Sequence, residues 1–282
     1  MSVTKRIVTI IFLILIVVLV FQFRRDNALK WHQENDYRWA QLPFRKHGKP
    51  GFKQLSASKT KITFSNQLTR DQITNNRHLL NGSGVAVGDV NGDGLVDIYF
   101  CRLNGSNILY KNLGNWKFED ITAAAGVACP EQFSTGTALA DIDGDGDLDL
   151  LVTTLGGPHF SFLNDGLGNF TDVTNSSGLI ANTGATSQAL ADIDGDGDLD
   201  LYVTNYKKST VKDHYLPQEL EFDRIVKKVG SDYEIIPEFQ EHYTVQYLNK
   251  NILMRYEYAE PDKLYLNDGK GNFQVVSFID GR

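Results

Sequence analysis

Short apolar runs separated by turn-forming residues are the dominant pattern of the chain from about residue 80 onward. Clear examples are residues 84–88, 150–154 and 201–204, which are rich in valine, leucine and threonine. Runs of β-branched and aromatic residues bounded by Gly, Asn and Asp are typical of strands. The pattern therefore predicts an all-β fold for most of the chain.

A second apolar pattern recurs at residues 109–118, 162–170 and 264–273. In each copy an apolar stretch leads into an Asn/Asp/Gly turn, and an aromatic residue follows the turn. This order predicts a β-hairpin. Together with the runs described above, it gives about four short strands in a repeat of about 50 residues, which favours a propeller blade over a helical solenoid.

The N-terminal end carries a different pattern. Residues 7–23 are apolar except for Thr9 and Gln22, and Lys5 and Arg6 precede them. As a helix this stretch would be about 26 Å long, the lower limit for crossing a bilayer. A cleaved signal peptide, the alternative, would show small residues after the apolar core, whereas residues 21–25 here are Phe-Gln-Phe-Arg-Arg. We interpret residues 1–25 as an uncleaved signal anchor, that is, a transmembrane helix.

Three acidic loops, residues 89–97, 141–149 and 192–200, begin 52 and 51 residues apart. Three to five carboxylates in nine residues repel one another unless a cation lies among them, and Ca²⁺ takes six to eight oxygen ligands. Glycines at positions 4 and 6 permit the turn around an ion. We predict about three Ca²⁺ ions, held by side chains at positions 1, 3, 5 and 9 and the backbone carbonyl at position 7. The candidate ligands are Asp89, Asn91, Asp93, Leu95 and Asp97; Asp141, Asp143, Asp145, Asp147 and Asp149; and Asp192, Asp194, Asp196, Asp198 and Asp200.

The first loop has the fewest carboxylates and should bind Ca²⁺ most weakly. An EF-hand is one alternative, but it needs a glutamate at position 12 and flanking helices. Position 12 is Phe100, Val152 and Val203 in the three copies, and the flanks are strand-like. A solvated acidic turn without an ion is the other alternative.

The loops and the Asn/Gly turns resemble the FG-GAP or VCBS repeats of integrin α-subunit-type β-propellers. Residues 82–89, the Phe-x-Asp-Ile/Val-Thr segments and the Ala-Gly-Val segment at residues 125–127 more specifically resemble the ASPIC/UnbV, or cartilage acidic protein, group. This resemblance covers roughly residues 60–205 and 262–278. It implies about seven blades, calcium in the blade loops, export, and a role in adhesion or recognition without an established catalytic site. The chain would supply about three to four of those blades, as the N-terminal portion of a longer protein.

The third repeat contains a long insertion. The last loop Asp and the turn Asn lie 15 residues apart in the first two repeats and 67 in the third. Within residues 206–262 the spacing of Phe222, Ile225, Val226 and Val229 predicts a helix that Gly230 ends. A tyrosine cluster suits a contact surface, and insertions often mark the binding face; a helix–hairpin cap packed on its own blade is the alternative. The tyrosines are Tyr206, Tyr215, Tyr233, Tyr243, Tyr247, Tyr256 and Tyr258.

The net charge of −7 is local, because the three loops hold 13 of the 35 acidic residues. Basic residues occur as scattered pairs, which argues against nucleic-acid binding. No H-E-x-x-H, G-x-S-x-G or phosphate-loop motif occurs, and we interpret His159 as a solvated loop histidine. Cys101 and Cys129 either pair, as in exported proteins, or remain free and buried.

We therefore expect a signal anchor at residues 1–25, a stalk at 26–60 and FG-GAP-type propeller blades at 61–282, interrupted by the mixed insert at 206–262. The leading function is a calcium-binding, membrane-anchored, non-enzymatic module that recognises a protein or glycan in the periplasm or outside the cell. The alternatives are an exported propeller lyase or hydrolase with its site in further blades, and a purely structural module of a larger surface protein.

Overall fold

The computed structural model describes residues 30–33, 38–41, 51–249 and 252–276, and the chain divides into two compact units at Gln54/Leu55. In the first unit, β1 (Trp31–Gln33) and β2 (Arg38–Ala40) form an antiparallel hairpin in which His32 stacks on Trp39. The expected membrane helix at residues 1–25 lies outside the described residues. Within the described ranges, no helix combines the length and apolarity that a bilayer crossing requires.

The second unit opens with short helices that the sequence analysis did not predict. These are α2 (Ala57–Thr60), α3 (Arg70–Asn75) and the 3-10 helix η1 (Arg77–Asn81). Thr69 and Gln72 form a capping box at the start of α3, because each side chain bonds the other residue's backbone N–H. This pairing satisfies N–H groups that the first helical turn leaves open, and it fixes where α3 begins.

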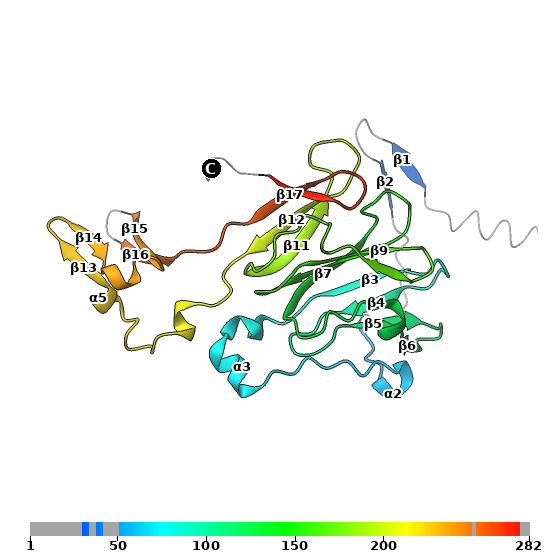
Figure 1. Ribbon diagram of the computed structural model, residues 1–282, viewed down its shortest axis with the longest axis horizontal. Helices are drawn as coiled ribbons and strands as arrows, with labels where there is room; N and C mark the ends of the chain where they lie inside the picture. Colours follow the sequence, from blue (N-terminus) through cyan, green and yellow to red (C-terminus); the bar gives the residue numbers. More distant parts are fainter. Residues whose placement is uncertain (1–29, 34–37, 42–50, 250–251, 277–282) are drawn as a thin grey trace, which may run out of the picture. The chain divides into compact units, whose positions relative to one another are not determined.

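Three four-stranded antiparallel sheets follow, and they confirm the predicted repeat of four strands (Figure 1). The first two sheets take their strands in chain order, as β3-β4-β5-β6 and β7-β8-β9-β10, and the third is β11-β12-β17-β18. The predicted hairpins are the pairs β5–β6, β9–β10 and β17–β18. The bounds are β3 (Val85–Gly88), β4 (Asp97–Phe100), β5 (Ile108–Asn112), β6 (Phe118–Asp120), β7 (Ser134–Ala140), β8 (Asp149–Thr154), β9 (Phe160–Asn164), β10 (Phe170–Asp172), β11 (Ala185–Ala191), β12 (Asp200–Asn205), β17 (Lys263–Asn267) and β18 (Phe273–Val276).

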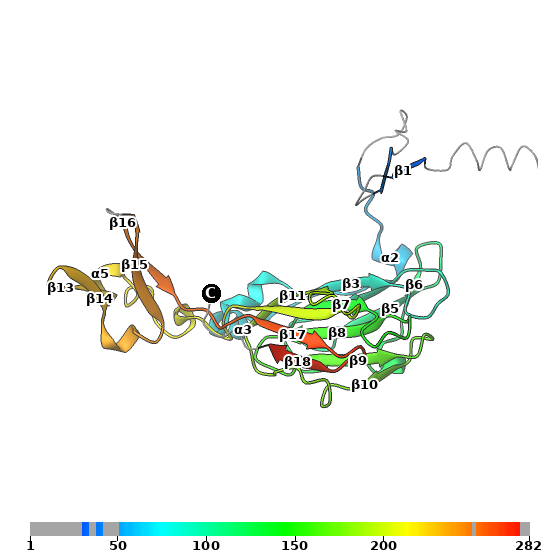
Figure 2. The same ribbon diagram turned by 90° about the horizontal axis from the view of Figure 1, so that it is seen from above.

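The sheets pack face against face, as propeller blades do. Strands β3, β7 and β11 lie next to one another (Figures 1 and 2). One core lies between the first two sheets and joins Tyr99 and Leu109 to Leu150. The next core joins Leu151 to Leu201 and Tyr265 between the second and third sheets. Burial of each such side chain stabilises the fold by roughly 1.5–3 kcal/mol, so the two cores between sheets contribute substantially to stability.

Both cysteines lie in the first core, and they are free. Burial raises the pKa of Cys129 to about 12 and that of Cys101 further. Thiols with such a high pKa are almost never ionised and are therefore unreactive. Of the two alternatives, the structure has free, buried cysteines. They lie near the short helix α4 (Thr122–Ala125), which connects the first two sheets.

The insert folds around its own apolar core. That core consists of Val211, Leu220, Ile225, Val226, Ile235, Phe239 and Tyr243. Its elements are η2 (Val211–Asp213), α5 (Phe222–Ile225), β13 (Val226–Val229), β14 (Asp232–Ile235), η3 (Pro237–Phe239), β15 (Tyr243–Asn249) and β16 (Ile252–Glu257). Asp262 secures its base by accepting hydrogen bonds from the Tyr202 hydroxyl and the Asn205 N–H.

The predicted helix through Val229 is wrong beyond its first turn. Only Phe222–Ile225 is helical, and Val226–Val229 pairs with Asp232–Ile235 as a β-hairpin. Gly230 has a φ of 63° and makes the hairpin turn instead of ending a helix. Valines favour a strand once a partner strand is available, and the neighbouring β14 supplies one here.

Candidate metal centre

Each acidic loop connects the first two strands of a sheet. The second loop lies between β7 and β8, and its glycines at positions 4 and 6, Gly144 and Gly146, have φ values of 77° and 95°. The corresponding glycines of the other two loops also have positive φ. Residues with a Cβ rarely adopt this conformation, so the predicted need for glycine at both positions is confirmed.

The acidic side chains organise the loop backbone. In the second loop, Asp141 accepts the Gly144 N–H through Oδ1 at 2.8 Å and the Gly146 N–H through Oδ2 at 3.1 Å. Asp143 accepts the Asp145 N–H, and Asp145 accepts the Asp147 N–H. The same bonds recur in the third loop. In the first loop the Oδ1 of Asp89 accepts the Asp93 N–H in place of a position-4 N–H, and the other bonds are the same. These hydrogen bonds from the backbone to the side chains give the loop its shape without a bound ion.

Position 9 has a second role that the sequence analysis missed. Asp149 is buried, with 1% of its surface exposed, and it accepts the Ile142 N–H at 2.9 Å and the Asn164 N–H at 2.8 Å. Asp97 and Asp200 make the equivalent pairs of bonds. This carboxylate therefore ties the start of its loop to the end of the third strand. The signal was available, because the turn asparagine recurs at a fixed distance in the first two repeats.

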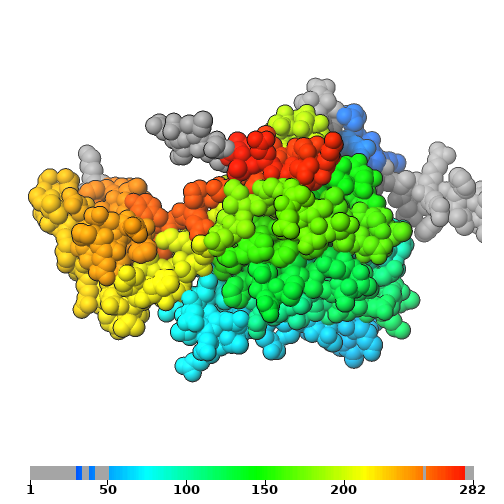
Figure 3. Space-filling view, viewed as in Figure 1, coloured from blue at the N-terminus to red at the C-terminus, as the bar shows by residue number. Residues whose placement is uncertain are grey.

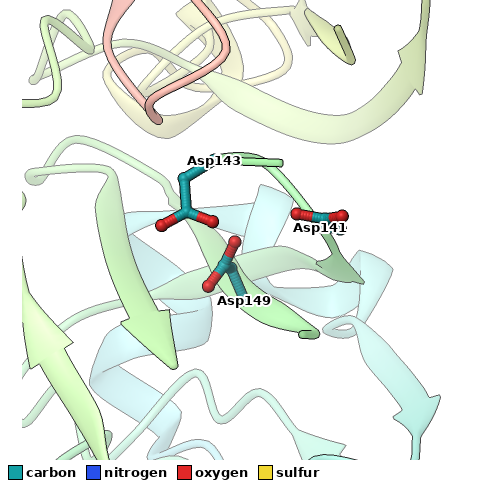
Figure 4. Close-up of side chains that lie close together, drawn as sticks. All are labelled: Asp141, Asp143 and Asp149. Atoms are coloured by element: carbon teal, nitrogen blue, oxygen red, sulfur yellow. The ribbon is translucent and has the colours of Figure 1, made fainter. Parts of the chain in front are cut away.

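Positions 1, 3 and 9 converge in the last two loops. The carboxylates of Asp141, Asp143 and Asp149 have oxygens within 4.8 Å of one another, and Figure 4 shows them around one small space. Asp192, Asp194 and Asp200 form the same arrangement. In the first loop Asn91 takes the place of the position-3 carboxylate, so the group there is Asp89, Asn91 and Asp97 by analogy of position.

Positions 5 and 7 are not part of these groups in the described residues. At position 5, Asp93, Asp145 and Asp196 accept the N–H two residues ahead. At position 7, a Cβ on Gly166 would overlap the Asp147 carboxylate, and Gly269 stands in the same relation to Asp198. The position-7 side chains Asp147 and Asp198 thus lie against the turn that follows the third strand. In the first repeat a Cβ on Gly114 would lie 3.8 Å from the Leu95 side chain.

The electrostatics of the groups favour a cation. Burial, together with the charges of Asp143 and Asp145, raises the pKa of Asp149 to about 6, although backbone hydrogen bonds from Asn164 and Ile142 oppose the shift. Burial and neighbouring carboxylates also raise the pKa of Asp143 and of Asp194. A nearby positive charge removes this penalty. Because all the donors are oxygens, the set suits a hard ion such as Ca²⁺.

A neighbouring sheet covers each of the first two loops. The Asn164 side-chain amide donates to the Val90 carbonyl of the first loop at 2.8 Å and to the Leu148 carbonyl of its own loop at 3.0 Å. Asn267 donates in the same way to Ile142 of the second loop, at 2.7 Å, and to Leu199. The turns of the second and third sheets therefore dock on the acidic loops of the sheets before them.

His159 does not behave as a solvated loop residue, so that interpretation is wrong. Only 2% of its surface is exposed; its Nδ1 accepts the Thr154 N–H at 3.1 Å, and its Nε2 lies 3.0 Å from the Thr183 hydroxyl. Because Nδ1 accepts, the proton lies on Nε2, which donates to Thr183. Burial lowers the pKa of His159 to about 4. The residue is a neutral structural link between distant segments.

Comparison with known proteins agrees with the repeat geometry. A family model described as an FG-GAP-like repeat matches residues 89–152 and 141–203. Cartilage acidic protein 1 of Mus musculus is 35% identical over 134 residues, covering 46% of this chain and 21% of that protein. The Homo sapiens protein is 34% identical over 134 residues, with 46% and 20% covered, and the Xenopus tropicalis protein 34% over 127 residues, with 44% and 20%.

The chain thus matches about a fifth of the length of these curated relatives. The residues that the family model matches include all three acidic loops. On these grounds the chain is an FG-GAP repeat protein of the group that includes cartilage acidic protein 1.

Proposed function

We propose that the chain is a calcium-stabilised recognition module that acts outside the cytoplasm and is held at the membrane by residues 1–25. Calcium binding is proposed because three carboxylates converge at the same positions of two repeated loops. The FG-GAP-like repeats and the similarity to cartilage acidic protein 1 support an extracytoplasmic, adhesive or recognition role. The proposed role is binding and not catalysis, and the same similarities support it.

Calcium has a structural part in this proposal. Each loop brings several carboxylates close together. Their oxygens would coordinate Ca²⁺, and its charge would offset their mutual repulsion. The groups at positions 1, 3 and 9 would hold the ion, with positions 5 and 7 completing the shell. Extracellular calcium modules bind at about 10⁻⁴–10⁻³ M, so the sites would be filled outside a cell.

Calcium titration by calorimetry tests this part. The wild-type chain should bind about three ions, and Asp143→Ala and Asp194→Ala should each remove one. Glu119→Gln, a change to an exposed acid of β6 outside the loops, is the matched control and should leave the stoichiometry unchanged. An unchanged stoichiometry in both loop variants would refute the assignment.

Recognition is assigned to the insert. The outward side of the β15–β16 hairpin exposes Leu248, Met254 and Tyr256, and Tyr258 follows it with 47% of its surface exposed. Tyr243 is buried in the insert core, so only part of the tyrosine cluster is available for contact. An exposed group of aromatic and thioether side chains is typical of a contact surface.

Replacement of residues 207–261 by a short Asn/Gly turn tests the insert. Asp262 stays, because it holds the third sheet through Tyr202 and Asn205. The shortened chain should bind as much calcium as the wild type and should lose capture of extracellular proteins and glycans. If it unfolds, the insert is a structural cap; if it captures the same ligands, recognition lies on the blades.

A further inference from the structure

A pocket of about 350 Å³ lies where the insert meets the 3-10 helix η1. Figure 3 shows this junction, where the cyan segment around residue 77 borders the yellow start of the insert. Two hydrogen bonds join the two segments: the Asn76 side chain donates to the Lys208 carbonyl, and the Arg77 N–H donates to Asp213. The pocket is lined by Arg77, Lys212, Tyr215, Pro217, Leu220 and Arg255.

Three of these six side chains are cationic, although the whole chain carries a net charge of −7. Among the described residues, Arg77, Lys212 and Arg255 form no ion pair, whereas other basic side chains do. Asp213, which follows Lys212 in the chain, accepts hydrogen bonds from the Arg77 N–H and from Thr210. The pocket therefore gathers three cationic side chains that, among the described residues, form no ion pair of their own.

The pocket is also pre-organised. The Arg255 Nη1 donates to the Leu220 carbonyl at 2.9 Å, and the guanidinium lies 4.3 Å from the centre of the Tyr243 ring. Tyr215 packs on Phe239 with ring centres 4.7 Å apart. These contacts anchor the floor in the insert core. A guanidinium has five N–H donors, so donors remain on Arg255 for a ligand.

We propose that this pocket binds an acidic sugar, meaning a pyranose ring that carries a carboxylate. The carboxylate would accept hydrogen bonds from the cationic side chains, and arginine matches its planar shape. Tyr215, Pro217 and Leu220 offer an apolar surface for the C–H face of the ring. A neutral sugar would leave the cations without a partner, and a small anion would leave the apolar floor uncovered. This inference rests on the proposed recognition role and names its ligand class.

Titration of the full chain with glucuronate in saturating calcium tests the inference, with glucose and acetate as comparison probes. Chemical shifts or calorimetry should show saturable glucuronate binding, and glucose and acetate should each bind at least about tenfold more weakly. Arg77→Gln and Lys212→Gln should each weaken glucuronate binding by about tenfold. Lys228→Gln, at an exposed lysine of β13 outside the pocket, is the matched control and should change nothing.

Several outcomes would overturn the inference. Equal binding of acetate and glucuronate would show an anion site without sugar recognition, and equal binding of glucose would remove the role of the cations. No glucuronate binding by a chain that still binds calcium would also refute it. If such a chain captures other ligands through the insert, only this inference fails. If it captures none, the proposed recognition function fails as well.

Discussion

Single residues in the acidic loops can hold the backbone and also belong to a group of converging carboxylates, and position 9 shows this most clearly. Asp149→Asn replaces one carboxylate oxygen with an NH₂ group, so the Ile142 or the Asn164 N–H loses its acceptor. We expect a loss of about 1–3 kcal/mol in the free energy of unfolding, measured with urea in the presence of chelator. Asp145→Asn is the control, since its one bond to the Asp147 N–H survives, and it should cost less than about 0.5 kcal/mol. Equal losses would contradict the bridging role.

His159 should make stability depend on pH. The folded protein favours its neutral form, so its pKa falls from 6.5 to about 4. The contribution of a group with a lowered basic pKa is complete above pH 6.5 and is lost as the pH falls toward 4, at most by about 3 kcal/mol. Unfolding measured at several pH values should show this loss in the wild type and not in His159→Gln. A constant difference between the two proteins across that range would refute the prediction.

At this scale the sequence indicates local chemistry and misses distant partners. The glycines at positions 4 and 6 were predictable because the turn they form lies within the same nine residues. The burial of His159 was not, because Thr183, its partner, lies 24 residues away. The bridge from Asp149 to Asn164 spans 15 residues and requires that both strands be placed first.

At the scale of elements, the turn asparagines link one sheet to the next. Asn164 bonds both its own loop and the Val90 carbonyl of the preceding sheet, whereas Asn112 bonds only the Val96 carbonyl of its own sheet. Asn164→Ala should therefore cost about 1 kcal/mol more than Asn112→Ala in chemical denaturation. In each variant a turn N–H also loses the asparagine Oδ1 that accepts its hydrogen bond, so the difference isolates the link between sheets. Identical costs would show that the link contributes nothing.

Strands and hairpins could be predicted because their turn residues are local signals. The helix expected from Phe222 to Val229 failed because β14 offers Val226–Val229 a pairing partner that the apolar spacing does not reveal. The capping box of Thr69 and Gln72 was present in the sequence and would have located α3. The core of the insert, in contrast, depends on contacts between segments that no single motif marks.

At the scale of the whole molecule, calcium should add to the stability of the stacked sheets. Binding stabilises the folded state by RT ln(1 + [L]/Kd), about 1–2 kcal/mol per site at a tenfold excess over Kd. A chelator should therefore lower the melting temperature measured by calorimetry, and Ca²⁺ should restore it. Mg²⁺ demands a smaller octahedral site and should restore less. A melting temperature that is the same with and without chelator would rule out the structural role of calcium.

The docking of a turn on each of the first two loops would affect how an ion leaves them. Val90 and Ile142, beside the first two sites, are 1% exposed, whereas Ile193 beside the third is 52% exposed. In the described part of the chain, no turn asparagine reaches the Ile193 carbonyl. In the first two loops, the bond from the neighbouring turn restrains the backbone at position 2, so the ligands there should separate less readily when an ion leaves. Release of an ion from these two loops into excess chelator should therefore be slower than the affinity of the loops alone would indicate.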